Sequence, residues 1–158
     1  MMHRHMLATL AVALLFGCAA PGVLPMKEHG AHYQTANDGK SRVYVYREKD
    51  FVGSGRGIYI LADGQRIGGV NAGTYFVHVV DPGKEVTITA ENSLSDADAV
   101  NRKLVTAANH SYYIRASLKT GVWDAMPYIE IVAEQEGAQA IQGLSYQTVD
   151  SAYRKTGL

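Results

Sequence analysis

The side chains that could support catalysis are few and lie far apart in the sequence. Ser93, His110 and Asp124 are the three residue types of a nucleophilic triad, in which an acid orients the base that activates a serine. Ser93 lacks the Gly-x-Ser-x-Gly surroundings of a nucleophile elbow, and His110 beside Asn109 is better explained as a turn residue. The spacing therefore does not predict an enzyme.

Oxygen ligands for a metal are also sparse. Asp96 and Asp98 could offer carboxylates to calcium, which takes six or more oxygens and usually needs a glycine in the turn. Because no glycine occurs between Lys84 and Gly121, a solvated loop is the better interpretation of this stretch. The single cysteine, Cys18, excludes an intramolecular disulfide and a zinc site built from cysteines. We expect neither a metal nor a cofactor.

Residues 53–57, which read Gly-Ser-Gly-Arg-Gly, form the richest glycine cluster. A phosphate cradle needs glycines that open a helix, so that backbone N–H groups meet the anion. An alternating strand pattern follows here instead, and we expect a flexible loop. Arg56 remains a candidate contact for an anionic group such as a lipid headgroup or a glycan.

The first eighteen residues have the order of a secretory signal. His3, Arg4 and His5 give a positively charged start, and the run Met6–Phe16 that follows is apolar apart from Thr9. This run is shorter than the ~20 residues that cross a bilayer as a helix. We therefore expect a leader that is cleaved rather than a transmembrane anchor.

The end of this leader, Leu15-Phe16-Gly17-Cys18, resembles a bacterial lipobox. In lipoproteins with this motif the cysteine thiol takes a diacylglycerol, the chain is cut before the cysteine, and the new amine is acylated. Two or more acyl chains, such as palmitate, anchor a protein stably to a membrane. Ala19 stands where an aspartate would favour the inner membrane. The resemblance therefore implies lipidation of Cys18 and a place on the periplasmic face of the outer membrane.

Length, charge and composition bound the rest of the chain. Its 158 residues predict one domain, and 15 basic against 15 acidic side chains argue against a nucleic-acid partner. Apolar residues make up 47%, which is too many for a disordered chain. We expect four parts: a signal peptide at 1–17, the lipidated cysteine and a flexible tether at 18–41, a β-domain at 42–144 and a polar tail at 145–158.

Alternating residue patterns predict strands through residues 42–133. Asp63-Gly64 predicts a tight hairpin, and Asp81-Pro82-Gly83 predicts a second turn. We expect a polar loop at 92–101 and a short helix within 134–144. The close spacing of the strands predicts a mainly β fold, a small antiparallel β-sandwich of about seven to eight strands with a short C-terminal helical segment.

Tyrosines are concentrated in the predicted strands. Aromatic pairs across strands explain part of this excess, but tyrosine and tryptophan are also enriched where proteins meet partners. We predict an exposed binding face made of some of Tyr44, Tyr46, Tyr59 and Trp123, with Arg56 beside it and Trp123 as the best candidate for its anchor. Ordinary packing within the sheets is the alternative.

Two stretches of the predicted β-domain resemble a known family. Residues 57–68 read Gly-Ile-Tyr-Ile-Leu-Ala-Asp-Gly-Gln-Arg-Ile-Gly, and residues 73–86 read Gly-Thr-Tyr-Phe-Val-His-Val-Val-Asp-Pro-Gly-Lys-Glu-Val. With the lipobox, they resemble the prokaryotic lipoproteins of domain of unknown function 2846 over residues 42–133. Residues 58–90 are also similar to β-sandwich modules of the Pro-Glu-Gly-Ala type, which are associated with carbohydrates. The resemblance implies a β fold and an envelope location, and it supplies no catalytic residue.

These observations favour one function and leave two alternatives open. We expect a lipid-anchored, non-enzymatic accessory or structural subunit of a cell-envelope complex, which contacts an envelope protein partner. The first alternative is a module that binds glycan or peptidoglycan through the tyrosines and Trp123. The second is a small periplasmic hydrolase or metalloprotein. An edge of the sandwich could also pair with a strand of another chain, but the sequence does not say which edge is open.

Overall fold

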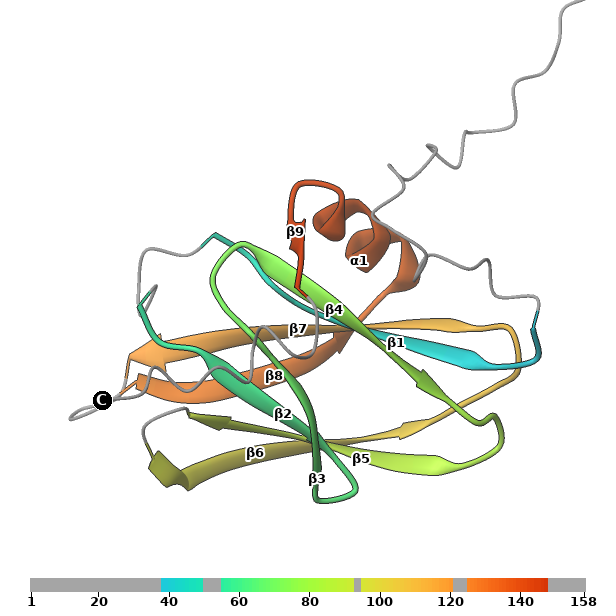
Figure 1. Cartoon of the computed structure of the whole chain (residues 1–158), viewed down its shortest axis with the longest axis horizontal. Coiled ribbons are helices and arrows are strands. Elements are labelled where there is room, and N and C mark those ends of the chain that lie inside the picture. The colour runs from blue at the N-terminus through green and yellow to red at the C-terminus, as the bar shows by residue number, and fades with distance from the viewer. Residues whose placement is uncertain (1–37, 50–54, 93–94, 121–124, 148–158) are drawn as a thin grey trace, which may run out of the picture.

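The computed structural model describes residues 38–49, 55–92, 95–120 and 125–147 (Figure 1). Within these ranges the chain forms nine strands and one helix. In chain order they are β1 (Ser41–Arg47), β2 (Ile58–Ala62), β3 (Gln65–Val70), β4 (Thr74–Val80), β5 (Glu85–Asn92), β6 (Ser95–Val105), β7 (Ser111–Thr120), β8 (Ala125–Val132), α1 (Glu134–Ile141) and β9 (Ser145–Tyr146).

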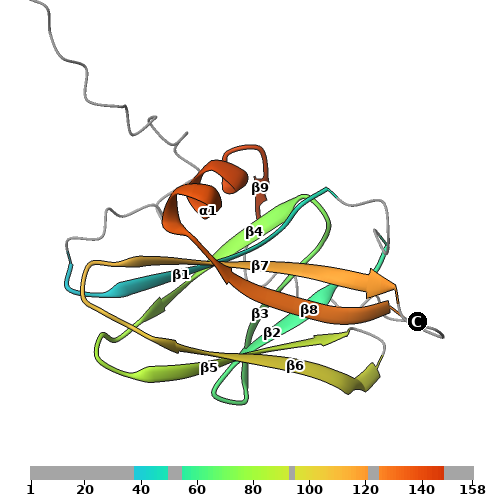
Figure 2. The same ribbon diagram turned by 180° about the vertical axis from the view of Figure 1, so that it is seen from behind.

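The strands form two sheets that pack face to face, with α1 on the outer side of one of them (Figure 1, Figure 2). The larger sheet has the order β8-β7-β1-β4-β9, and the smaller has the order β3-β2-β5-β6. The core between the sheets consists of branched aliphatic and aromatic side chains, including Val43, Val45, Ile58, Ile60, Phe76, Ile88, Ile114 and Ile129. The predicted mainly β sandwich with a short helix is confirmed.

Two of the strand pairings are parallel. β1 pairs with β7 in parallel, with Tyr46 opposite Arg115, and β9 pairs in parallel with β4. The chain leaves the larger sheet after β4, forms the β5–β6 hairpin in the smaller sheet, and returns as β7 beside β1. The sandwich is therefore mixed rather than purely antiparallel, because this return places two distant strands side by side with the same direction.

The predicted turn between β2 and β3 is confirmed by its backbone. Asp63 has φ of 48° and Gly64 has φ of 79°, which are the left-handed values that a tight hairpin turn requires. The Asp63 carboxylate also accepts a hydrogen bond of 2.9 Å from the backbone N–H of Thr87 in β5. This contact ties the tip of the β2–β3 hairpin to the neighbouring strand.

Two segments differ from the sequence prediction. β6 begins at Ser95, inside the stretch expected to be a polar loop, because the backbone pairing of β5 with β6 continues to Asn92 opposite Ser95. The expected polar tail begins with the two residues of β9, which pair with β4. Sequence pattern misses both elements because they depend on backbone pairing rather than on apolar alternation. The predicted signal peptide and most of the tether lie outside the described residues.

Strand β1 is buried on both faces, and a third layer covers its outer face. Tyr44 and Tyr46 point away from the core between the sheets, yet they are 4% and 0% exposed. Helix α1 approaches closely because Gly137 lies against Tyr113, where an added Cβ would fall 2.2 Å from that side chain. Tyr44 and Tyr113 stack with 4.9 Å between ring centroids. The outer face is thus a second apolar cluster rather than a solvent surface.

The Tyr46 hydroxyl is buried and has no hydrogen-bond partner among the described residues. Removing a buried polar group that makes no hydrogen bond relieves its desolvation cost. We expect Tyr46→Phe to raise the free energy of unfolding by about 1 kcal/mol in chemical denaturation. Tyr112→Phe is the control, because the Tyr112 hydroxyl accepts a 2.9 Å bond from the backbone N–H of Ala107, and its loss should destabilise the fold. Equal destabilisation by both variants would show instead that the Tyr46 hydroxyl is bonded in the folded protein.

Candidate functional site

Two of the tyrosines predicted for the aromatic binding face are not on the surface. Tyr44 and Tyr46 are buried under α1, so the prediction that they are exposed is wrong. Tyr59 lies on the smaller sheet, half-buried, with the Arg66 guanidinium 3.9 Å from its ring centroid. Tyrosine is amphipathic, and a strand pattern does not show whether a helix will later cover it. The alternative of a glycan-binding tyrosine face thereby loses two of its residues.

The other predicted residues lie apart or outside the described ranges. Arg56 is half-buried, and its backbone carbonyl accepts a 2.6 Å hydrogen bond from Nη1 of the buried Arg47. Cys18, Trp123, Ser93 and Asp124 all fall outside the described residues, so the lipidation, anchor and triad interpretations are not placed by the structure.

His110 has the turn position that the sequence predicts. Its Nδ1 lies 2.9 Å from the carbonyl of Ala108, and the preceding Asn109 has φ of 59°. Within the described ranges, His, Cys, Asp and Glu side chains form no group suited to a metal ion. Of the helices in those ranges, none is long and apolar enough to cross a membrane.

The feature that the sequence does not reveal is an open edge on β4. β9 pairs with Thr74 and Tyr75 alone, through hydrogen bonds from Ser145 N to Gly73 O at 3.0 Å and from Gln147 N to Tyr75 O at 2.8 Å. β4 continues to Val80, and no described strand pairs with residues 77–80 on the side away from β1 (Figure 1). Backbone groups alternate along a strand, so those of Val77 and Val79 point to this open side, as those of Tyr75 do.

A groove of about 450 Å³ lies beside this edge. Its walls come from the end of β4, the β2–β3 hairpin, the start of β5 and the residue that precedes β1. The lining has an apolar floor of Ala62, Ile67, Val80 and Val86, with the exposed Val79 at its edge. Its polar residues are Lys40, Asp63, Gln65, His78, Asp81 and Lys84. We call this surface the edge groove.

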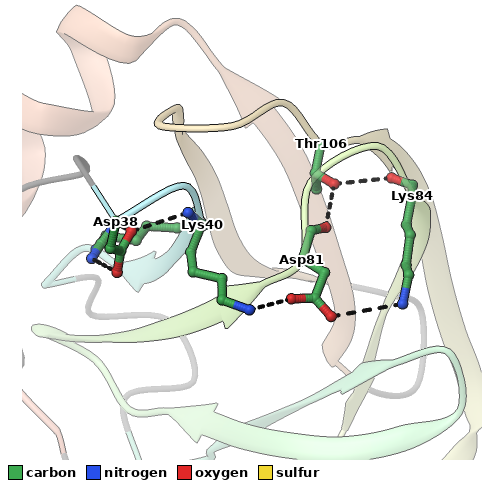
Figure 3. Close-up of polar contacts among 6 residues, drawn as sticks. Asp38, Lys40, Asp81, Lys84 and Thr106 are labelled. Atoms are coloured by element: carbon green, nitrogen blue, oxygen red, sulfur yellow. Dashed lines mark hydrogen bonds and ion pairs between the residues drawn. The ribbon is translucent and has the colours of Figure 1, made fainter.

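Two lysines share one carboxylate at the rim of the edge groove (Figure 3). Lys40 Nζ lies 2.5 Å from Asp81 Oδ1, and Lys84 Nζ lies 3.7 Å from Asp81 Oδ2. The Lys40 ammonium beside Asp81 holds the pKa of that carboxyl below its usual range, and Asp81 raises the pKa of Lys40. These three groups therefore carry one surplus positive charge at neutral pH, which the Asp63 carboxylate on the β2–β3 side of the groove balances over the groove as a whole.

Backbone contacts hold this rim in place. The Thr106 hydroxyl lies 3.0 Å from the Asp81 carbonyl and 3.1 Å from the Lys84 carbonyl, to which it donates. The backbone N–H of Lys40 donates to Asp38 at 3.0 Å, and Asp38 also accepts from the buried Arg42 (Figure 3). The turn after β4 and the start of β1 are thus fixed relative to the edge groove, so its charges are presented by ordered backbone.

A second group of charges, which we call the Arg115 cluster, pins α1 to the larger sheet. Arg115 Nε donates to Glu130 at 2.5 Å, and Arg115 Nη1 donates to Glu136 of α1 at 3.1 Å. Glu48, just after β1, lies 3.8 Å from the same guanidinium. The carboxylates raise the pKa of Arg115, with the Glu130 hydrogen bond as the largest cause. This cluster joins four parts of the fold at the helix that covers β1.

Two stacked sheets with a helix on one outer face define a β-sandwich domain. Within that class, the chain belongs to the family described as "Protein of unknown function (DUF2846)", which matches residues 37–127. An uncharacterised protein of Haemophilus influenzae is similar, with 28% identity over 139 residues that span 86% of this chain and 80% of that protein. No solved structure matches the chain.

His78 gives the edge groove a titratable imidazole. Burial lowers the pKa of His78 below its ordinary 6.5, and the charged groups that share the groove are Lys40, Asp63, Asp81 and Lys84. Its folded pKa lies below the unfolded one, so the folded state binds fewer protons. Stability from this group is therefore full above the unfolded value and falls as pH drops through the lowered pKa.

We expect the free energy of unfolding to fall as pH drops below about 6.5, because the histidine of the unfolded chain then becomes charged while burial resists charging of His78 in the folded state. His78→Gln should flatten this slope, measured by urea denaturation at each pH. His110→Gln is the matched control, because His110 is exposed in a turn. An unchanged slope in His78→Gln, or an equal change in both variants, would show that His78 is not the group responsible.

Proposed function

We propose that the protein is a lipid-anchored lipoprotein on the periplasmic face of the outer membrane and a non-enzymatic accessory subunit of an envelope complex. One observation carries the binding role: the edge of β4 beyond Tyr75 is unpaired among the described strands and borders the edge groove. An unpaired strand edge is a template for another chain, because its N–H and C=O groups lack partners. The anchor is the acylated Cys18 that the lipobox motif predicts.

The position of the edge groove suits a tethered subunit. Lys40 lines the groove and lies two residues from Asp38, where the described part of the chain begins. The start of β1 lies beside the end of β4 (Figure 1), so the groove is at the end of the sandwich where the described part of the chain begins. An anchor at Cys18 would connect this end of the sandwich to the membrane through the residues between Cys18 and Asp38.

The proposal is tested by crosslinking in native membranes followed by capture of the protein. Val79→Pro removes an N–H from the open edge of β4, and proline is tolerated on an edge strand when that N–H is not bonded within the sheet. Val105→Pro is the matched control. Both valines are exposed, Val105 by 67% and Val79 by 52%. The backbone N–H of the next residue, Thr106, donates to the Lys84 carbonyl within the sheet, so by alternation the Val105 N–H points away from the sheet.

We expect the wild type and Val105→Pro to capture one stoichiometric protein, and Val79→Pro to lose it. Metabolic labelling with palmitate should mark the wild type and not Cys18→Ser exported with a cleavable signal. Capture that survives Val79→Pro would overturn the binding role. Palmitate on the Cys18→Ser variant, or none on the wild type, would overturn the anchor.

A further inference from the structure

We infer that the edge groove takes an extended segment of a partner protein, which pairs with β4, inserts an apolar side chain and sets a carboxylate beside Lys84. This inference rests on the proposed function and deepens it, because it names the chemistry of the bound segment. Three independent features of the groove define that chemistry: the backbone of β4, the apolar floor and the two lysines that share Asp81 at the rim.

The backbone defines the conformation of the ligand. The backbone N–H of Ser145 donates to the Gly73 carbonyl, and that of Gln147 donates to the Tyr75 carbonyl. The outer side of β4 therefore already forms strand-type hydrogen bonds at its first residues. The peptide groups of Val77 and Val79 continue the same row of donors and acceptors. A segment that binds there must be extended, because strand addition satisfies this row at the spacing of a β-strand.

The other exposed edges are protected against such pairing. Edge strand β8 contains Pro127, which has no N–H to donate. Edge strand β6 carries Arg102 and Lys103, and edge strand β3 begins with Gln65 and Arg66. Charged residues and proline are the usual means by which proteins prevent edge pairing. The part of β4 from 77 to 80 reads Val-His-Val-Val and has no such protection.

The floor defines the side chain that faces inward. Phe76, His78 and Val80 alternate toward the interior of the sandwich, so a paired strand places its neighbouring side chain on the same side. That side chain enters a space bounded by the apolar residues Ala62, Ile67, Val80 and Val86. An aliphatic or aromatic residue fits this floor and extends the core of the sandwich, whereas a charged residue would lose its hydration there.

The rim defines the charge. Lys40 and Lys84 share the single carboxylate of Asp81, and Lys84 is the more distant of the two at 3.7 Å. A carboxylate on the bound segment can pair with Lys84 without displacing Lys40 from Asp81. The Lys84 side chain is 69% exposed, so this pair contributes little to affinity and mainly selects acidic over basic segments.

The test is a random peptide library displayed on phage and selected on the full mature protein in detergent micelles. We expect enriched peptides with alternating apolar residues next to an Asp or Glu. Binding of the synthesised peptides is then measured by fluorescence polarisation. Val79→Pro should weaken it by at least about tenfold, the loss expected for one or two backbone hydrogen bonds. Val105→Pro should leave it unchanged.

Charge is tested with a second matched pair of variants. Lys84→Glu should weaken the binding of acidic peptides a few-fold, which is about the contribution of an exposed ion pair. Lys103→Glu changes an equally exposed lysine, paired with Glu85 at 2.7 Å on the smaller sheet, and should have no effect. Enriched peptides that are basic or lack the alternation would overturn the inference. So would binding that Val79→Pro does not affect.

Two further outcomes separate the possible occupants. If peptides bind only after residues 148–158 are removed, those residues of this chain occupy the edge groove and the inference is wrong. If Val79→Pro abolishes capture of the native partner while the library yields no acidic alternating peptides, the inference fails and the proposed function stands. If such peptides bind at β4 but the native partner is still captured by Val79→Pro, the proposed function fails.

Discussion

The whole structure depends on β1 being buried on both of its faces. It lies at the centre of the five-stranded sheet, between β7 and β4, and all seven of its residues are buried. Val43 and Val45 face the core between the sheets, while Tyr44 and Tyr46 face the opposite way. A sandwich of two layers would leave these tyrosines in solvent. The chain therefore has to return after β8 and add a third layer, which is α1 packed on Tyr113 and held by the Arg115 cluster.

The same return pairs with only part of β4 within the described residues. After α1 the chain pairs with β4 for the two residues of β9, which contact Thr74 and Tyr75. The apolar cluster over β1 is complete at this point, with Leu144 in it and Tyr146 packed against it. Among the described strands, none pairs with the outer side of residues 77–80, which border the edge groove.

The local parts of this architecture could be predicted from sequence, and the long-range parts could not. Asp63-Gly64 specifies its turn because it tolerates left-handed backbone angles, and the strand pattern around it gives the sandwich. The burial of Tyr44 depends on a helix near the other end of the domain, so alternation alone could not separate it from an exposed residue. The edge groove joins Lys40, His78 and Lys84 from separate segments, and an open edge is a property of pairing that no single segment encodes.

The most direct test of the open β4 edge is photocrosslinking in living cells with a photoreactive amino acid at single positions. Val79 is on the open edge of β4, and Val105 is an exposed valine on the edge of the other sheet. We predict that a probe at Val79 gives one discrete adduct with an envelope protein, and that a probe at Val105 gives none. Adducts of equal yield at both positions, or none at Val79 with the protein correctly exported, would contradict the role of the β4 edge.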